Sequence, residues 1–144
     1  MLAVEAKRSN RYSRAFCIAM ADIDLFKQVN DSAGHECGDR LLQTAAALFL
    51  RECRDTDYVC RWGGEEFMFL FIDTDLAKAS VIAERIRAAF ESVSYECAGT
   101  ERRTISIGLT QSGPDVPVDR LIKRADDLLY EAKRTGRNRV VARG

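Results

Sequence analysis

Residues 61–67 read Arg61-Trp62-Gly63-Gly64-Glu65-Glu66-Phe67, between two runs that are rich in aromatic and aliphatic residues. These runs cover residues 57–62 and 67–72. Glycine tolerates the positive φ angles that a two-residue hairpin turn requires. The pattern therefore predicts a β-hairpin whose turn is formed by Gly63 and Gly64.

Two adjacent carboxylates, Glu65 and Glu66, follow the predicted turn in a strand that otherwise looks buried. Neighbouring strand residues point to opposite faces of a sheet, so the two side chains cannot share one role. An unpaired buried carboxylate is costly, and a divalent metal ion or a basic side chain would stabilise at least one of them. A surface turn with solvated glutamates is the alternative that these residues alone leave open.

The composition is that of one globular domain. The chain has 144 residues, enough to bury a hydrophobic core, and 47% of them are hydrophobic. Its 22 basic and 22 acidic residues cancel, which argues against a protein that coats nucleic acid. No apolar run approaches the roughly 20 residues that span a bilayer, and no signal peptide is evident. We expect a cytoplasmic location, either for the chain itself or as the cytoplasmic part of a larger, membrane-anchored protein, with no membrane contact from this segment.

Five cysteines, at positions 17, 37, 53, 60 and 97, are scattered along the chain. They are odd in number and form no Cys-x-x-Cys pair, which argues against a zinc site. We expect them to be free thiols, largely buried, in a reducing compartment.

Hydrophobic periodicity predicts alternating helices and strands. Two of the strand pairs are expected to be hairpins, so the sheet cannot be purely parallel. We expect an α/β (α+β) domain in which helices flank a central, mostly antiparallel mixed sheet. The expected helices cover residues 2–13, 25–31, 39–54, 76–90 and 121–133, and the expected strands cover residues 16–23, 57–62, 67–72, 94–97, 103–110 and 139–142, with a turn at 98–100.

Further charged residues lie at the ends of these elements. Asp22 and Asp24 share one face at the end of a strand and form a second acidic cluster. Asp39 lies where a helix is expected to begin, so an N-cap role would account for it. Lys133 and Arg137 are about one helical turn apart, and a basic helix end is favoured by the helix dipole.

Several motifs lie in order along the chain and together carry a family resemblance. They are Asp22-Ile23-Asp24-Leu25-Phe26-Lys27-Gln28-Val29-Asn30-Asp31, Gly34-His35, Gly38-Asp39, Gly63-Gly64-Glu65-Glu66-Phe67, Ser106-Ile107-Gly108, Ala125-Asp126, Tyr130-Glu131-Ala132-Lys133 and Gly136-Arg137-Asn138. The chain resembles the GGDEF family, in its GGEEF variant, over nearly its whole length. This resemblance implies a fold similar to the palm of nucleotide polymerases and class III nucleotidyl cyclases. It also implies a diguanylate cyclase, which condenses two GTP molecules into cyclic di-GMP and releases two pyrophosphates.

The resemblance implies a metal site of oxygen ligands. Asp22, Glu65 and the carbonyl of Ile23 match the family's ligands for Mg²⁺ or Mn²⁺. Glu65 and Glu66 match its catalytic carboxylates, and the sequence leaves open whether Glu66 is a metal ligand or a base.

The GTP-binding residues follow from the same resemblance. Asn30 and Asp39 match the pair that reads guanine, and Lys133 and Arg137 match the ligands of the terminal phosphates. The backbone N–H groups of residues 25–27 (Leu25, Phe26 and Lys27) are expected to bind phosphate as well, since amides at a helix start do so readily.

A second nucleotide site is implied upstream of the hairpin. Arg54 and Asp57 have the Arg-x-x-Asp form and lie at the offset of the family's inhibitory site, where the product cyclic di-GMP binds. Arg85 matches a secondary arginine of that site. A surface ion pair at a helix end is the alternative for Arg54 and Asp57.

The family resemblance also implies partners. Catalysis needs two subunits that face each other, so we expect a homodimer. The family's usual Leu-Thr-Gly-Leu motif before the first helix is missing, so we expect residues 1–144 to be one GGDEF domain excised from a longer protein with an upstream sensory or receiver domain. A catalytically silent receptor of GTP or cyclic di-GMP is the alternative function.

Overall fold

One five-stranded sheet forms the centre of the computed structural model, which describes residues 1–12, 14–95, 97 and 102–144. The strands, in spatial order, are β2 (Tyr58–Gly63), β3 (Glu66–Phe71), β1 (Cys17–Ile23), β4 (Ile105–Gln111) and β5 (Val140–Arg143). All neighbouring pairs are antiparallel except β4 and β5, which are parallel. The expected mixed, mostly antiparallel sheet is confirmed.

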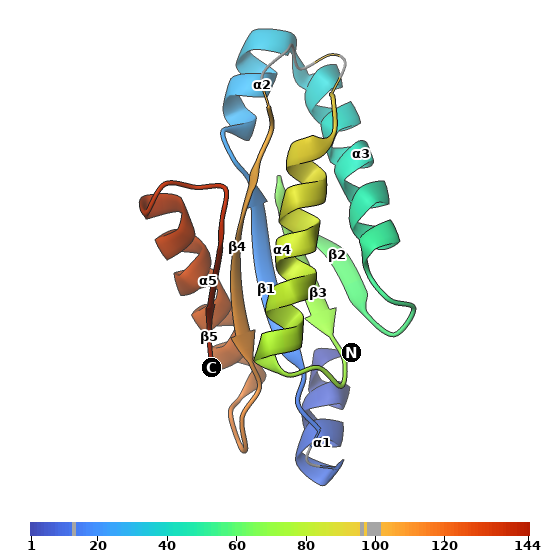
Figure 1. Cartoon of the computed structure of the whole chain (residues 1–144), viewed down its shortest axis with the longest axis vertical. Coiled ribbons are helices and arrows are strands. Elements are labelled where there is room, and N and C mark those ends of the chain that lie inside the picture. The colour runs from blue at the N-terminus through green and yellow to red at the C-terminus, as the bar shows by residue number, and fades with distance from the viewer. Residues whose placement is uncertain (13, 96, 98–101) are drawn as a thin grey trace.

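Helices cover both faces of this sheet (Figure 1). They are α1 (Leu2–Tyr12), α2 (Phe26–Ala33), α3 (His35–Glu52), α4 (Leu76–Ser92) and α5 (Val118–Arg134). Helices α3 and α4 pack on one face, whereas α5 packs on the other together with α1. None of the helices in the described part of the chain has the length and apolar character needed to cross a bilayer.

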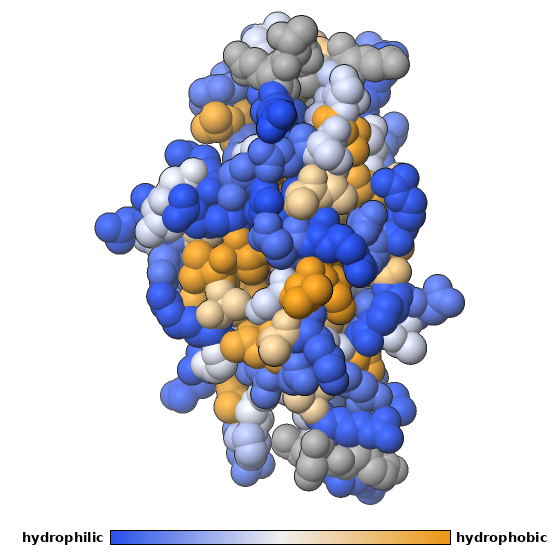
Figure 2. All heavy atoms as spheres, in the orientation of Figure 1, coloured by the Kyte–Doolittle hydropathy of each residue, from blue (hydrophilic) through white to orange (hydrophobic). Residues whose placement is uncertain are grey.

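Strand β1 has buried side chains on both faces of the sheet. Its residues are buried throughout, as expected of a central strand. Cys17, Ala19 and Ala21 point into the core beneath α3 and α4, whereas Ile18 and Met20 point towards α5, because side chains alternate along a strand. Figure 2 shows the outer side over α4, which is covered mainly by hydrophilic residues with smaller hydrophobic areas between them.

Helix α5 lies directly on Gly108 of β4. A Cβ atom at this position would overlap the backbone carbonyl of Ala125 and the backbone amide of Leu129. We expect Gly108→Ala to lower the free energy of unfolding by about 3 kcal/mol, because backbone atoms cannot rotate away as side chains do. Urea unfolding measures this loss. The matched control is Gly113→Ala, whose added methyl would meet only the Val116 side chain at 3.3 Å; equal losses in the two variants would contradict the close approach.

The predicted hairpin between residues 94–97 and 103–110 is wrong in its first strand. Ser94 and Tyr95 are not in a strand, and Cys97 lies in a 3₁₀ turn. Strand β4 instead pairs with β1 and β5. The predicted turn at residues 98–100 lies outside the described residues.

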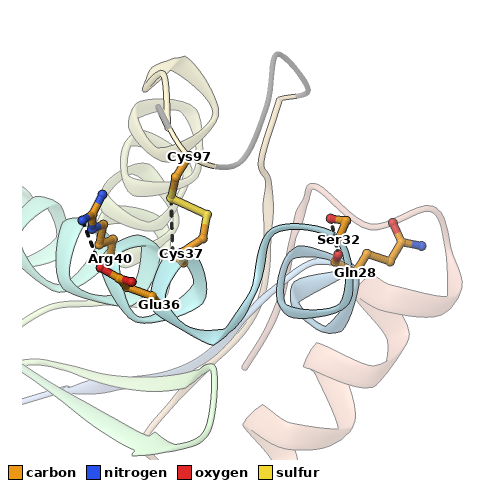
Figure 3. The surroundings of a disulfide bond; sticks show 6 residues. All are labelled: Gln28, Ser32, Glu36, Cys37, Arg40 and Cys97. Atoms are coloured by element: carbon orange, nitrogen blue, oxygen red, sulfur yellow. Dashed lines mark hydrogen bonds and ion pairs between the residues drawn. A yellow bond between two sulfur atoms is a disulfide. The ribbon is translucent and has the colours of Figure 1, made fainter.

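The cysteine prediction is wrong for one pair. Cys37, in the first turn of α3, forms a disulfide with Cys97, and their Cα atoms are 5.6 Å apart (Figure 3). The two residues are 60 positions apart, and only the packing of the segment after α4 against α3 brings them together. Cys17, Cys53 and Cys60 are free thiols, as expected, but only Cys17 is buried, whereas Cys53 is half-buried and Cys60 is exposed.

Candidate functional site

The β2–β3 hairpin forms as predicted, but its turn lies one residue further along the chain. Gly63 belongs to β2 and pairs with Glu66, so the turn residues are Gly64 and Glu65. The pairing shifts register between Arg61 and Gly63, which accommodates an extra residue on β2. Gly64 has a positive φ of 50°, a conformation that glycine adopts without strain.

The turn brings the acidic residues of two strands together. Asp22, near the end of β1, lies opposite Glu66 in the ladder with β3, and the N–H of Ile23 donates to the carbonyl of Glu65 at 3.3 Å. Burial, followed by the charges of Glu65 and Glu66, raises the pKa of the Asp22 carboxyl to about 6, although Lys133 opposes the shift. Asp22, Glu65 and Glu66 form an acidic cluster where β1 ends and β3 begins, and a cation would reduce the repulsion that Asp22 experiences.

Lys133 of α5 already meets this acidic cluster. Its Nζ lies 2.8 Å from Oδ2 of Asp22, and the Asp22 side chain is largely buried. The pair forms because α5 packs on the face of β1 to which Asp22 points. The lysine is therefore within reach of any anion that binds beside Asp22.

The oxygen atoms of Asp22, Glu65 and the Ile23 carbonyl suit a hard divalent cation. No group of three or more His, Cys, Asp or Glu side chains that could share a metal ion occurs in the part of the chain that the structure describes. Magnesium is commonly held by one or two carboxylates together with water and substrate phosphates. The Asp22 and Glu65 carboxylates with the Ile23 carbonyl would supply such oxygen ligands, whereas a zinc site would need more nitrogen or sulfur ligands.

Helix α2 begins at Phe26, three residues after Ile23. Leu25 is the N-cap residue with a left-handed φ of 56°, and its side chain is exposed. None of the side chains that the structure describes caps this helix start. The first amides of α2, at Phe26 and Lys27, thus begin the helix without a side-chain acceptor, as a phosphate-binding helix start requires.

Asp39 does not cap a helix. Helix α3 begins at His35, so Asp39 lies inside the helix with an exposed side chain, and the N-cap interpretation is wrong. It lines a groove of about 470 Å³ between α3 and β2, whose wall also includes Leu42 and Phe67. Phe67 packs in the core beneath α3, so the groove lies on the α3 side of the sheet.

Asn30 lies against the neighbour of Asp39. A Cβ atom on Gly38 would overlap the Asn30 side-chain oxygen, so the glycine is what allows this approach. That oxygen is buried and has no hydrogen-bond partner in the described residues. The structure therefore brings Asn30 and Asp39 to one end of α3 and leaves a polar acceptor there.

Lys133 and Arg137 are not on one helical turn. Helix α5 ends at Arg134, and Arg137 follows in a left-handed conformation with a φ of 59°. Its N–H donates to the carbonyl of Ala132 at 2.9 Å, a bond typical of helix termination. Gly136, as predicted, takes part in ending the helix, with a φ of 127°.

The Arg54–Asp57 pair is built into the fold. The guanidinium of Arg54 donates to both carboxylate oxygens of Asp57, at 3.1 and 2.8 Å, and also to the carbonyl of Ile72 at 3.0 Å. The Asp57 side chain is fully buried, whereas 46% of the Arg54 side chain is exposed. Only the arginine presents a free face to a ligand. Arg85, on α4, bonds to the Glu52 carboxylate at 3.1 Å and keeps 53% of its side chain exposed.

Comparisons with known proteins identify the family. The family model for the diguanylate cyclase GGDEF domain matches residues 1–139. The chain belongs to the GGDEF family. Diguanylate cyclase DgcM of Escherichia coli (strain K12) is 44% identical over 128 residues, and the response regulator PleD of Caulobacter vibrioides (strain NA1000 / CB15N) is 44% identical over 129 residues.

Solved GGDEF structures share the fold. The diguanylate cyclase SiaD of Pseudomonas aeruginosa, solved with its activator SiaC, superposes with a TM-score of 0.93 at 39% identity, over 99% of this chain and 55% of that chain. The active GGEEF domain of a diguanylate cyclase from Vibrio cholerae gives a TM-score of 0.89 at 32% identity, over 96% of this chain and 89% of that chain. The sequence alignment with DgcM covers 88% of this chain but only 30% of DgcM. The alignment with PleD covers 86% of this chain but only 28% of PleD.

Asp24 of this GGDEF domain was placed by the sequence in an acidic cluster with Asp22 but was assigned no individual function. Asp24 is buried and accepts hydrogen bonds from Thr104, Ser106 and the backbone of Asn138. Its alternation with Asp22 was the one signal available. Its partners lie 80 or more residues away and could not be inferred from spacing.

Proposed function

We propose that this chain is the catalytic domain of a diguanylate cyclase, which joins two GTP molecules into cyclic di-GMP and releases two pyrophosphates. The observation that carries the proposal is the cluster of Asp22, Glu65 and Glu66 beside Lys133, in a domain 44% identical to a curated diguanylate cyclase.

In the proposed reaction the 3′-hydroxyl oxygen of one GTP attacks the α-phosphorus of the other. The bond to pyrophosphate breaks, and the hydroxyl proton leaves to a base. The reciprocal attack, by the 3′-hydroxyl of the second GTP on the α-phosphorus of the first, closes the ring and releases the second pyrophosphate. A bound Mg²⁺ or Mn²⁺ would lower the pKa of that hydroxyl and neutralise phosphate charge. Asp22, Glu65 and the carbonyl of Ile23 would hold the ion, and Glu66 would be a further ligand or the base.

Other residues would bind and orient the nucleotide. Lys133 and Arg137 carry positive charge for the terminal phosphates. The amides at the start of α2, residues 25–27, would bind phosphate oxygens. The Asp39 carboxylate suits the two N–H donors on the Watson–Crick edge of guanine, and Asn30 would complete that contact.

Each domain binds one GTP in this scheme, so catalysis requires a homodimer. We propose that residues 1–144 form one GGDEF domain of a longer cytoplasmic or membrane-anchored protein, in which an upstream sensory or receiver domain controls pairing. This chain aligns with only 30% of DgcM and 28% of PleD, and the greater length of these relatives supports this arrangement. The SiaC activator bound to SiaD is an example of a regulatory partner in that relative.

The direct test incubates the purified chain at high concentration with GTP and Mg²⁺ and separates the products by chromatography. We expect cyclic di-GMP and pyrophosphate. If the chain alone is silent, fusion to a dimerising coiled coil supplies the second subunit. Continued silence of the fused dimer would overturn the cyclase proposal and favour a receptor of GTP or cyclic di-GMP.

Product feedback is a further part of the proposal. Cyclic di-GMP would bind the exposed faces of Arg54 and Arg85, since Asp57 is buried and occupied by bonds within the chain. Relatives of this chain bind the same molecule, including the GGDEF domain of DgcB from Caulobacter crescentus.

We expect Arg54→Ala to raise the inhibition constant of cyclic di-GMP by about ten- to a hundredfold, the value of one or two charge-assisted hydrogen bonds. Initial rates with added product measure this constant. The variant should also be less stable, because Asp57 keeps its buried charge without a cation. Arg51→Ala is the control, since Arg51 is exposed near the end of α3, three residues before Arg54, and its one ion pair among the described residues is a 3.9 Å contact with Glu52. An inhibition curve that Arg54→Ala leaves unchanged would show that the pair has a structural role alone.

A further inference from the structure

Asp24 joins three segments that surround the candidate site. It follows Ile23 directly and precedes Leu25, and only 5% of the residue is exposed. One oxygen, Oδ1, accepts from the Ser106 hydroxyl at 2.7 Å. The other, Oδ2, accepts from the Thr104 hydroxyl at 2.8 Å and from the backbone N–H of Asn138 at 3.1 Å. The carboxyl group thereby ties the end of β1 to the start of β4 and to the loop between α5 and β5.

That loop has a backbone that needs external support. Arg137 and Asn138 both have positive φ angles, 59° and 45°, which non-glycine residues adopt at a cost. Consecutive left-handed residues persist only where surrounding contacts hold them. The Asn138 backbone is held by Asp24, and its side-chain oxygen accepts from Arg87 at 2.6 Å.

We propose that Asp24 is a positioning residue, which fixes the α5–β5 loop so that Arg137 faces the phosphates beside Asp22 and Lys133. The inference rests on the phosphate role proposed for Arg137. Asp24 itself touches no substrate in this scheme. It acts through the Asn138 N–H, the peptide group that directly follows Arg137.

The required property is an acceptor at the position of Oδ2. A backbone N–H cannot reverse its direction, whereas the hydroxyls of Thr104 and Ser106 rotate and can either donate or accept. An asparagine at position 24 could place its carbonyl oxygen towards Asn138 and donate from its amide to Ser106. Asp24→Asn should therefore preserve the loop, whereas Asp24→Ala should release it.

The test measures the affinity of the α,β-methylene analogue of GTP with Mg²⁺ by titration calorimetry, so turnover does not interfere. We expect Asp24→Ala to weaken binding about tenfold or more, as the loss of one charge-assisted phosphate contact does, and Asp24→Asn to stay within about threefold. In an Arg137→Ala background, Asp24→Ala should have little further effect, because the arginine that it positions is gone. A merely structural role would not produce this non-additivity.

Equal effects of Asp24→Ala with and without Arg137 would overturn the positioning role and leave the proposed function standing. An Arg137→Ala variant with unchanged affinity would remove the phosphate role of that arginine, and the positioning proposal with it. If Asp24→Ala does not fold, Asp24→Ser replaces it in the double-mutant cycle with Arg137→Ala. The serine side chain is too short for its hydroxyl oxygen to reach the Asn138 amide. If Asp24→Asn binds the GTP analogue as weakly as Asp24→Ala does, an acceptor at the position of Oδ2 is not what holds the loop.

Discussion

Glu66→Gln is expected to reduce cyclic di-GMP synthesis by roughly 10²–10⁴-fold, the range for loss of a general base or an equivalent catalytic carboxylate. The substitution keeps the shape of the side chain and removes its charge at the position opposite Asp22. The measurement is the initial rate of product formation from GTP and Mg²⁺. Binding of GTP should remain detectable, since Lys133, Arg137 and Asp39 are unchanged.

The control for this variant is Glu5→Gln, the same chemical change on α1, outside the proposed site. Urea unfolding of both variants separates a catalytic loss from a folding defect. Normal turnover by Glu66→Gln would remove Glu66 from the catalytic group. A loss of equal size in Glu5→Gln would show that the effect is not specific to the acidic cluster.

Reduction of the Cys37–Cys97 disulfide is expected to lower the free energy of unfolding by about 2–4 kcal/mol. The bond closes a loop of 60 residues, and a cross-link of this length restricts the unfolded chain by about 4 kcal/mol in the chain-entropy model. The measurement is urea unfolding of the oxidised protein and of the protein reduced by a dithiol, which becomes a disulfide itself as both cysteines become thiols.

Serine variants identify which cysteines account for the change in stability on reduction. Cys37→Ser/Cys97→Ser should have the stability of the reduced protein and should not respond to the dithiol. Cys60→Ser, at an exposed free thiol, should keep the response of the wild type. Oxidised and reduced wild-type protein with the same unfolding midpoint would contradict a stabilising cross-link.

Most elements of the fold were predictable because their signals are local. The apolar run of β1 and the helical periodicity of α4 and α5 each lie within fewer than 20 residues. The predicted strand at 94–97 failed because strand signals in a short segment are weak, and β4 has its partners in β1 and β5 instead. The start of α3 was missed because Gly34 replaces the usual polar N-cap residue.

The candidate site was predictable as a set of residues and not as a geometry. The motifs name Asp22, Glu65 and Lys133, and the structure brings Lys133 to 2.8 Å from Asp22. The turn at Gly64 and Glu65 is displaced by one residue because of the shifted register on β2, which depends on pairing with β3 rather than on the turn residues.

By itself, the sequence determined the family, the mixed sheet with helices on both faces and the residues able to carry the chemistry, because these follow from local periodicity and from motifs in order. Only the tertiary structure decided which distant groups meet. The disulfide joins residues 60 positions apart, and the bond from Asn138 to Asp24 joins residues 114 positions apart. Such contacts depend on how α5 and the segment after α4 pack on the rest of the chain, and no local pattern of residues encodes that packing.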